Sequence, residues 1–127
     1  MKRIEQEEQM KVIEWAQWQR GRFPCLELLF HIPNGGGRTK AEGGILKAMG
    51  VKKGIPDLFL PCARGGYNGL FIEMKAEGGT VSREQGEIMA QLRSEGYSAE
   101  VCVGASAAIS VIEKYLKSET FGKGAKG

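Results

Sequence analysis

Apolar and polar positions along the 127-residue chain repeat with two different periods, which is typical of a protein that mixes helices and strands. Spacings of three and four residues predict helices at residues 3–20, 39–50, 82–96 and 106–117. Short apolar runs, in part alternating with polar residues, predict strands at residues 25–32, 57–61, 69–76 and 98–104. The order α-β-α-β-β-α-β-α favours an α/β fold with a mixed sheet flanked by helices.

Charged residues occupy the ends of two predicted core strands. Asp57 follows a proline at the start of one apolar run, and Glu73 and Lys75 close the next one. Residues two apart on a strand point to the same face, so Glu73 and Lys75 project together, on the side of Phe71. If the two strands form a hairpin, Asp57 lies opposite Glu73. The pattern then predicts two carboxylates and an ammonium group at one end of the sheet.

Two neighbouring carboxylates repel each other unless a cation lies between them. A divalent cation bound by oxygen atoms meets this need, and Mg²⁺ is the usual choice where phosphates are involved. Lys75 beside such an ion would orient a water molecule or stabilise negative charge on phosphorus. Each feature alone has a simpler reading, since Pro-Asp is common in turns and Glu-x-Lys often forms a surface ion pair. Their combination is what indicates catalysis.

Composition and charge narrow the class of protein. With 42% hydrophobic and 26% charged residues, the chain is typical of one globular domain. Its net charge of +3 permits a nucleic-acid partner without requiring one. No apolar run is long enough for a membrane span. Three distant cysteines without a CxxC motif favour neither a zinc cluster nor a disulfide framework, so we expect a cytoplasmic protein.

A family resemblance rests on several stretches taken together: "EQEEQMKVIEWAQW", "HIPNGGGRTK", "KKGIPDLFL", "GLFIEMKAEGG", "SREQ" followed by "LRSEGY", and "AEVCVG". The chain resembles the VRR-Nuc family of the PD-(D/E)xK nuclease superfamily over about residues 5–117. This resemblance implies a restriction-endonuclease-like α/β fold with a mixed sheet. It also implies one nuclease domain at residues 1–117. The end of the chain is rich in glycine and lysine, so we expect a flexible tail at 118–127.

The resemblance assigns roles to residues of the predicted site. Asp57 and Glu73 would be the main ligands of Mg²⁺ or Mn²⁺, with the backbone carbonyl of Met74 as a third oxygen. Lys75 would be the catalytic lysine, and Gln85 would hold a water molecule or a phosphate oxygen. The family also places an acidic residue on the first helix, and we expect this catalytic and metal-binding residue to be Glu8, with Glu5 as the alternative.

Further residues near the predicted site are assigned to DNA binding, although basic side chains are often only a solvated face. The only histidine also has a structural reading as a residue at a strand end. The DNA-binding set is His31, Asn34, Arg38, Lys40, Lys52 and Lys53.

The resemblance implies a metal-dependent, structure-specific DNA endonuclease. Because the chain is short, we expect the stand-alone type that resolves Holliday junctions, a type often encoded by phages, in the cytoplasm of a bacterial host cell. A flap nuclease, a general replication or repair nuclease, and a non-catalytic DNA-binding module with the same fold are the alternatives. A four-way junction has approximate two-fold symmetry, so a resolving enzyme with one site per chain is expected to be a homodimer.

Overall fold

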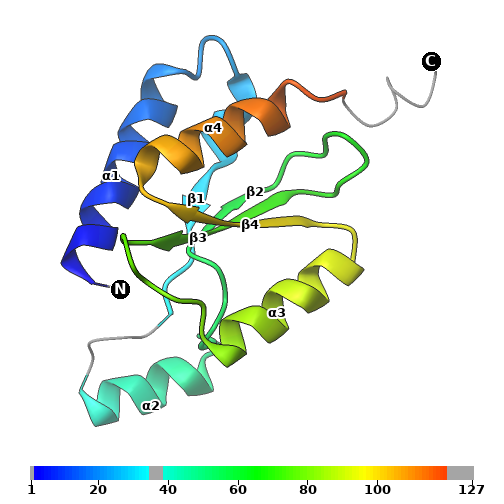
Figure 1. Cartoon of the computed structure of the whole chain (residues 1–127). Helices are drawn as coiled ribbons and strands as arrows, with labels where there is room; N and C mark the ends of the chain where they lie inside the picture. The colour runs from blue at the N-terminus through cyan, green and yellow to red at the C-terminus, as the bar shows by residue number, and fades with distance from the viewer. Residues whose placement is uncertain (1, 35–38, 120–127) are drawn as a thin grey trace.

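The computed structural model describes residues 2–34 and 39–119, and its centre is a four-stranded mixed sheet (Figure 1). The strand order is β1-β2-β3-β4, in which β1, β2 and β3 are antiparallel and β4 runs parallel to β3. The strands are β1 (Phe30–His31), β2 (Leu58–Leu60), β3 (Leu70–Lys75) and β4 (Ser98–Val103).

Helices cover both faces of this sheet. Helices α1 (Arg3–Trp18) and α4 (Ala105–Leu116) lie on one face, α3 (Arg83–Ser94) lies on the other, and α2 (Lys40–Ala48) lies below the sheet in the view of Figure 1. The expected α/β architecture, a mixed sheet flanked by helices, is therefore confirmed. None of the described helices is long and apolar enough to cross a membrane.

The alternation of side chains along β3 divides the interior into two cores. Leu70, Ile72 and Met74 point toward α1 and α4 and belong to the larger core, with Val12 and Ile112. On the opposite face, a smaller core packs against α3. Its members are Phe71, Met89 and Ala99, with Ile32, Phe59, Leu92 and Tyr97 packed around them.

The predicted strand at residues 25–32 is mostly wrong. Residues Pro24–Leu28 form a 3₁₀ helix, η1, and only Phe30–His31 pair with β2. Pro24 suits the first turn of a helix because it has no N–H to be satisfied there. Leu26 is buried, while Leu28 is exposed. The alternation of these leucines with Glu27 resembles the pattern of a strand, but only one of them enters the core.

Helix α1 packs its second half against the larger core. Val12 and Ala16 are buried, but Ile4 is exposed. At the other end of the domain, α4 ends at Leu116, and the backbone oxygen of Glu119 accepts a hydrogen bond from Gly65 N–H at 2.7 Å. Residues 118–119, predicted as the start of a flexible tail, are thus in contact with the loop after β2; residues 120–127 lie outside the described residues.

Cys25 and Cys62 form a disulfide, which the spacing of the cysteines did not favour. The two residues are 37 positions apart in sequence, but η1 brings Cys25 over the end of β2 and places their Cα atoms 6.4 Å apart. Such proximity is a property of chain packing that cysteine spacing does not reveal. Burial raises the pKa of the third cysteine, Cys102, to about 11, so its thiol stays protonated. The cytoplasmic location remains a prediction, without the support of cysteine chemistry.

Reduction of this disulfide should destabilise the domain. The chain-entropy model for a closed loop of this length gives a loss of about 3–4 kcal/mol in the free energy of unfolding. We expect urea denaturation of the purified protein to show this loss on adding reductant, and denatured protein without reductant to titrate one thiol. A Cys25→Ala/Cys62→Ala variant should be insensitive to reductant. Three titratable thiols in the untreated denatured protein would contradict the bond.

Candidate active site

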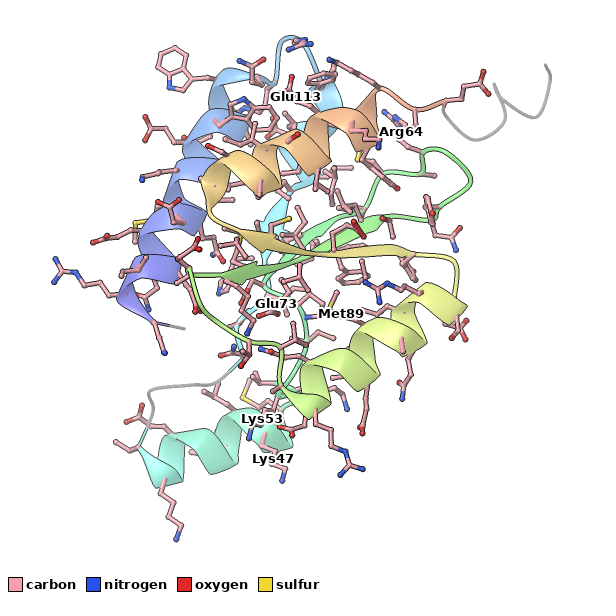
Figure 2. All side chains as sticks on the ribbon, viewed as in Figure 1. Lys47, Lys53, Arg64, Glu73, Met89 and Glu113 are labelled. Atoms are coloured by element: carbon pink, nitrogen blue, oxygen red, sulfur yellow. A yellow bond between two sulfur atoms is a disulfide. The ribbon has the colours of Figure 1, made fainter. Side chains whose placement is uncertain are left out.

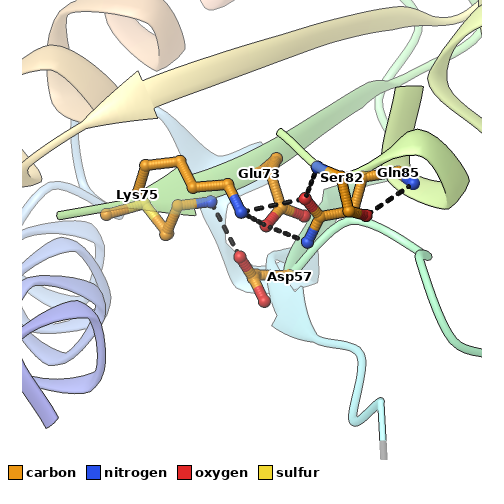
Figure 3. Close-up of polar contacts among 6 residues, drawn as sticks. Asp57, Glu73, Lys75, Ser82 and Gln85 are labelled. Carbon is orange, nitrogen blue, oxygen red and sulfur yellow. Dashed lines mark hydrogen bonds and ion pairs between the residues drawn. The ribbon is translucent and has the colours of Figure 1, made fainter. Parts of the chain in front are cut away.

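Asp57, Glu73 and Lys75 converge at one end of the sheet, as the alternation of the strands predicted. Pairing of Leu58 with Ile72 places Asp57 opposite the end of β3. There its Oδ2 atom accepts a hydrogen bond from the Met74 N–H at 2.7 Å (Figure 3). Asp57, Glu73 and Lys75 are only 3%, 3% and 8% exposed. Three ionisable side chains are therefore buried together, which is costly unless they are paired and hydrogen-bonded.

Gln85 supplies most of that pairing from the first turn of α3. Its Oε1 atom accepts a hydrogen bond from Lys75 Nζ at 2.9 Å, and its Nε2 donates to Glu73 Oε2 at 3.1 Å. Lys75 Nζ also lies 3.4 Å from Glu73 Oε2. Figure 3 shows the three side chains meeting between β3 and the start of α3. The structure thus joins four of the five predicted catalytic residues: Asp57, Glu73, Lys75 and Gln85.

A pocket of about 410 Å³ opens over these side chains. Its walls come from the start of α1, the ends of the strands, the loop after β3 and the first turn of α3. The lining residues are Lys2, Glu5, Asn34, Asp57, Glu73, Lys75, Gly79, Thr80 and Gln85. Sequence reasoning gave no role to Lys2, Gly79 or Thr80. Gly79 ends the motif "GLFIEMKAEGG", but no motif or periodicity links Lys2 or Thr80 to the site.

Glu5, rather than the preferred Glu8, is the glutamate of α1 that faces the pocket. Glu8 lies almost one turn further along and reaches the start of α4, where its Oε1 accepts the Ala105 N–H at 2.9 Å. Its Oε2 accepts a hydrogen bond from Lys11 Nζ at 2.6 Å, which together with the Ala105 bond lowers the pKa of Glu8. The N-cap position of α4 is Gly104, which has no side chain, so Glu8 supplies the missing acceptor.

Burial and mutual repulsion govern the charges of the two pocket carboxyls. Burial raises the pKa of Asp57, and the Met74 N–H bond opposes this rise. For Glu73, burial and then the negative charge of Asp57 raise the pKa to about 7, against the attraction of Lys75. When both carboxyls are ionised, the site holds more negative charge than Lys75 alone neutralises, and a divalent cation would relieve it.

The oxygen donors of the pocket suit an ion such as Mg²⁺, which does not need all its ligands from the protein. Among the described residues, no three His, Cys, Asp or Glu side chains form a cluster that could hold a metal by themselves. Mg²⁺ commonly keeps several water molecules and takes one or two carboxylates plus phosphate oxygens. Asp57 and Glu73 meet that requirement. The Met74 carbonyl points to the same edge of β3 as its N–H, toward Asp57.

The residues assigned to DNA binding are placed unevenly. Lys52 and Lys53 line a neighbouring groove of about 530 Å³, which meets the site pocket at Asn34. Figure 2 shows Lys53 and Lys47 beside α2, below Glu73. Lys40 is exposed at the start of α2, and Arg38 lies outside the described residues.

His31 has a structural partner next to the site. Its Nδ1 lies 2.8 Å from the backbone oxygen of Asp57, which also accepts the Ile32 N–H at 2.8 Å. Because a carbonyl only accepts, Nδ1 carries the proton in this arrangement. The contact fixes the strand end that carries Asp57, in agreement with the structural reading of this histidine.

Comparisons with known proteins agree with this architecture. A family model described as the VRR-NUC domain matches residues 4–106. A solved structure described as a VRR_NUC domain protein is 35% identical, with a TM-score of 0.78 over 94% of this chain and 93% of that chain. No curated protein matches. The fold is of the nuclease type. The chain belongs to the VRR-NUC family, as the sequence motifs indicated.

Ionisation of Glu73 should make the metal-free protein less stable as pH rises. The pKa of Glu73 is about 7 in the folded protein and 4.5 ordinarily, so the stabilising effect of its protonated form is complete below about pH 4.5. That effect is lost as pH rises through about 7, at a cost on the order of a few kcal/mol. We expect urea denaturation in chelator to show wild type losing stability across this range relative to Glu73→Gln. Parallel pH curves for the two proteins would contradict the assignment.

Proposed function

We propose that this protein is a metal-dependent DNA endonuclease that hydrolyses phosphodiester bonds. The observation that carries the proposal is the convergence of Asp57, Glu73 and Lys75 in one pocket, with Gln85 hydrogen-bonded to two of them. A non-catalytic DNA-binding module would not need a buried lysine held beside two carboxyls. Membership of the VRR-NUC family adds support.

Mg²⁺ or Mn²⁺ would be held by Asp57 and Glu73, with the Met74 carbonyl and Glu5 as further oxygen donors. When bound, the ion would neutralise phosphate charge and lower the pKa of a water molecule. Lys75 has three N–H donors. One donates to Gln85 Oε1, a second faces Glu73 in an ion pair, and a third is left for a substrate. The third would donate to a non-bridging phosphate oxygen and stabilise the negative charge that develops during hydrolysis. Gln85 would keep the ammonium group in position.

Removal of either carboxylate should abolish cleavage. We expect Asp57→Asn and Glu73→Gln to lower kcat by at least about 100-fold, and Lys75→Ala to do the same while remaining folded. DNA affinity of the two carboxylate variants should be unchanged or higher, because a negative charge that repels phosphate is gone. Cleavage of labelled four-way junction, flap and duplex DNA with Mg²⁺, Mn²⁺ or EDTA measures these effects. Wild-type rates in either carboxylate variant, or in EDTA, would overturn the proposal.

Glu5 and Glu8 provide a matched pair on one helix. Glu5→Gln should reduce cleavage and raise the Mg²⁺ concentration needed for it, because Glu5 lines the pocket. Glu8→Gln should instead lower the melting temperature and leave kcat near that of wild type, since Glu8 caps α4. The opposite outcome would restore Glu8 as the catalytic glutamate.

We further propose that the substrate is branched DNA, and in particular a Holliday junction. The groove lined by Lys47, Lys52 and Lys53 adjoins the pocket at Asn34 and would contact phosphates next to the scissile bond. A flap or general repair nuclease would use the same pocket, so the substrate rests on family resemblance and on symmetry. Resolution of a junction takes two symmetric cuts, and each chain contributes one site.

The oligomeric state of the protein distinguishes a junction substrate from a flap substrate. If the protein resolves junctions, light scattering at micromolar concentration should give the mass of a homodimer, with an interface that buries about 1,200–2,000 Å² in total. Junction cleavage should also exceed flap and duplex cleavage. A monomer that remains monomeric on DNA and prefers flaps would favour the flap-nuclease alternative and leave the metal chemistry intact.

A further inference from the structure

The N-terminal cap of α3 and the candidate active site share one side chain. Ser82 is the N-cap of α3, and its Oγ accepts the Gln85 N–H at 3.1 Å. In return, the Ser82 N–H donates to Gln85 Oε1 at 2.9 Å, which completes a capping box. The Gln85 amide that closes the box is the same group that contacts Lys75 and Glu73 (Figure 3).

The contacts of this amide allow only one orientation. Gln85 Oε1 receives two donors, the Ser82 N–H and Lys75 Nζ, while Nε2 faces the Glu73 carboxylate. A flipped amide would place its NH₂ group against two donors and its oxygen against an acceptor. Ser82 and Lys75 therefore orient the amide together, and the Ser82 contact does not depend on the charge state of the site.

We infer that Ser82 is a positioning residue of this active site, which acts through Gln85. The Ser82 hydroxyl accepts a hydrogen bond from the Gln85 backbone N–H, and the Ser82 N–H donates to the Gln85 side-chain oxygen. Gln85 is therefore held both at its backbone and at its side-chain amide. The fixed amide then holds Lys75 Nζ in place at the pocket, next to Glu73. The inference rests on the proposed function, because it assigns Ser82 a role in the same hydrolysis.

Helix α2 offers a matched control, because it has the same type of cap away from the site. Thr39 Oγ1 accepts a hydrogen bond from the Glu42 N–H at 3.1 Å. The bond from the Gln85 N–H to Ser82 Oγ is of the same type and has the same length. Among the residues that line the site pocket, Thr39 is absent. Loss of the Thr39 cap measures what capping alone contributes to stability.

Steady-state cleavage at saturating DNA and Mg²⁺ tests the inference. We expect Ser82→Ala to lower kcat about tenfold with little change in KM, because a displaced catalytic group loses rate rather than binding. Ser82→Thr keeps a capping hydroxyl and should retain most of the wild-type kcat. Thr39→Ala should lower the melting temperature to a similar extent as Ser82→Ala while leaving kcat unchanged. If both alanine variants change kcat equally, or neither does, the inference is wrong.

A double-mutant cycle shows whether Ser82 acts through Gln85. In a Gln85→Ala background, Ser82→Ala should lower the melting temperature but cause no further loss of kcat. If Ser82→Ala lowers kcat by the same factor in wild type and in Gln85→Ala, Ser82 does not act through Gln85 and the inference is wrong.

The Gln85 side-chain NH₂ signal in NMR spectra of the metal-free, DNA-free protein gives a readout that does not depend on activity. It should be protected from solvent exchange in wild type and Ser82→Thr, and lose protection in Ser82→Ala. If wild type cleaves no DNA, the proposed function fails, whereas an NH₂ signal that is equally protected in all three proteins overturns the role of Ser82.

Discussion

The burial of Asp57, Glu73 and Lys75 beside one another is the constraint on which the rest of the structure depends. Ionisable groups can leave water only if each finds a partner in the interior. Asp57 finds the Met74 N–H, and Glu73 and Lys75 find the Gln85 amide. These contacts require β2 to begin just after Asp57 and α3 to begin just before Gln85. The ends of both elements are therefore set by the chemistry of the site.

The smaller core holds α3 at the distance that those contacts need. Phe71 lies on the same face of β3 as Glu73, and its ring stacks on Phe59 with ring centroids 4.1 Å apart. Tyr97 packs edge-on against Phe71 at 5.3 Å. This aromatic cluster lies under α3 and supports it, so that Gln85 reaches β3. Apolar packing and the polar side chains of the candidate site are thus adjacent on one strand face.

Helix α1 connects the site to the opposite layer of the fold. Glu5 lines the pocket, while Glu8 caps α4 less than one turn further along the same helix. Two glutamates three residues apart therefore do different work, one at the mouth of the site and one in the packing of two helices. Through Glu5, a helix that packs on one face of the sheet also lines the pocket beside α3.

The local relations of this protein were predictable from its sequence. A period of two on β3 places Glu73 and Lys75 on one face, hairpin pairing places Asp57 opposite them, and the spacing of Ser82 and Gln85 predicts a helix start. Each relation involves residues close in sequence or paired across one turn. Family motifs added the role of Gln85.

Packing between distant segments decided the remaining features. Which glutamate of α1 lines the pocket depends on how α1 packs against the sheet, and the Cys25–Cys62 bond depends on how η1 lies over β2. Lys2 and Thr80 reach the pocket only because the start of α1 and the loop after β3 meet there. Periodicity reports which face of an element is buried, but not which other element covers it. That information exists only once the whole chain has packed.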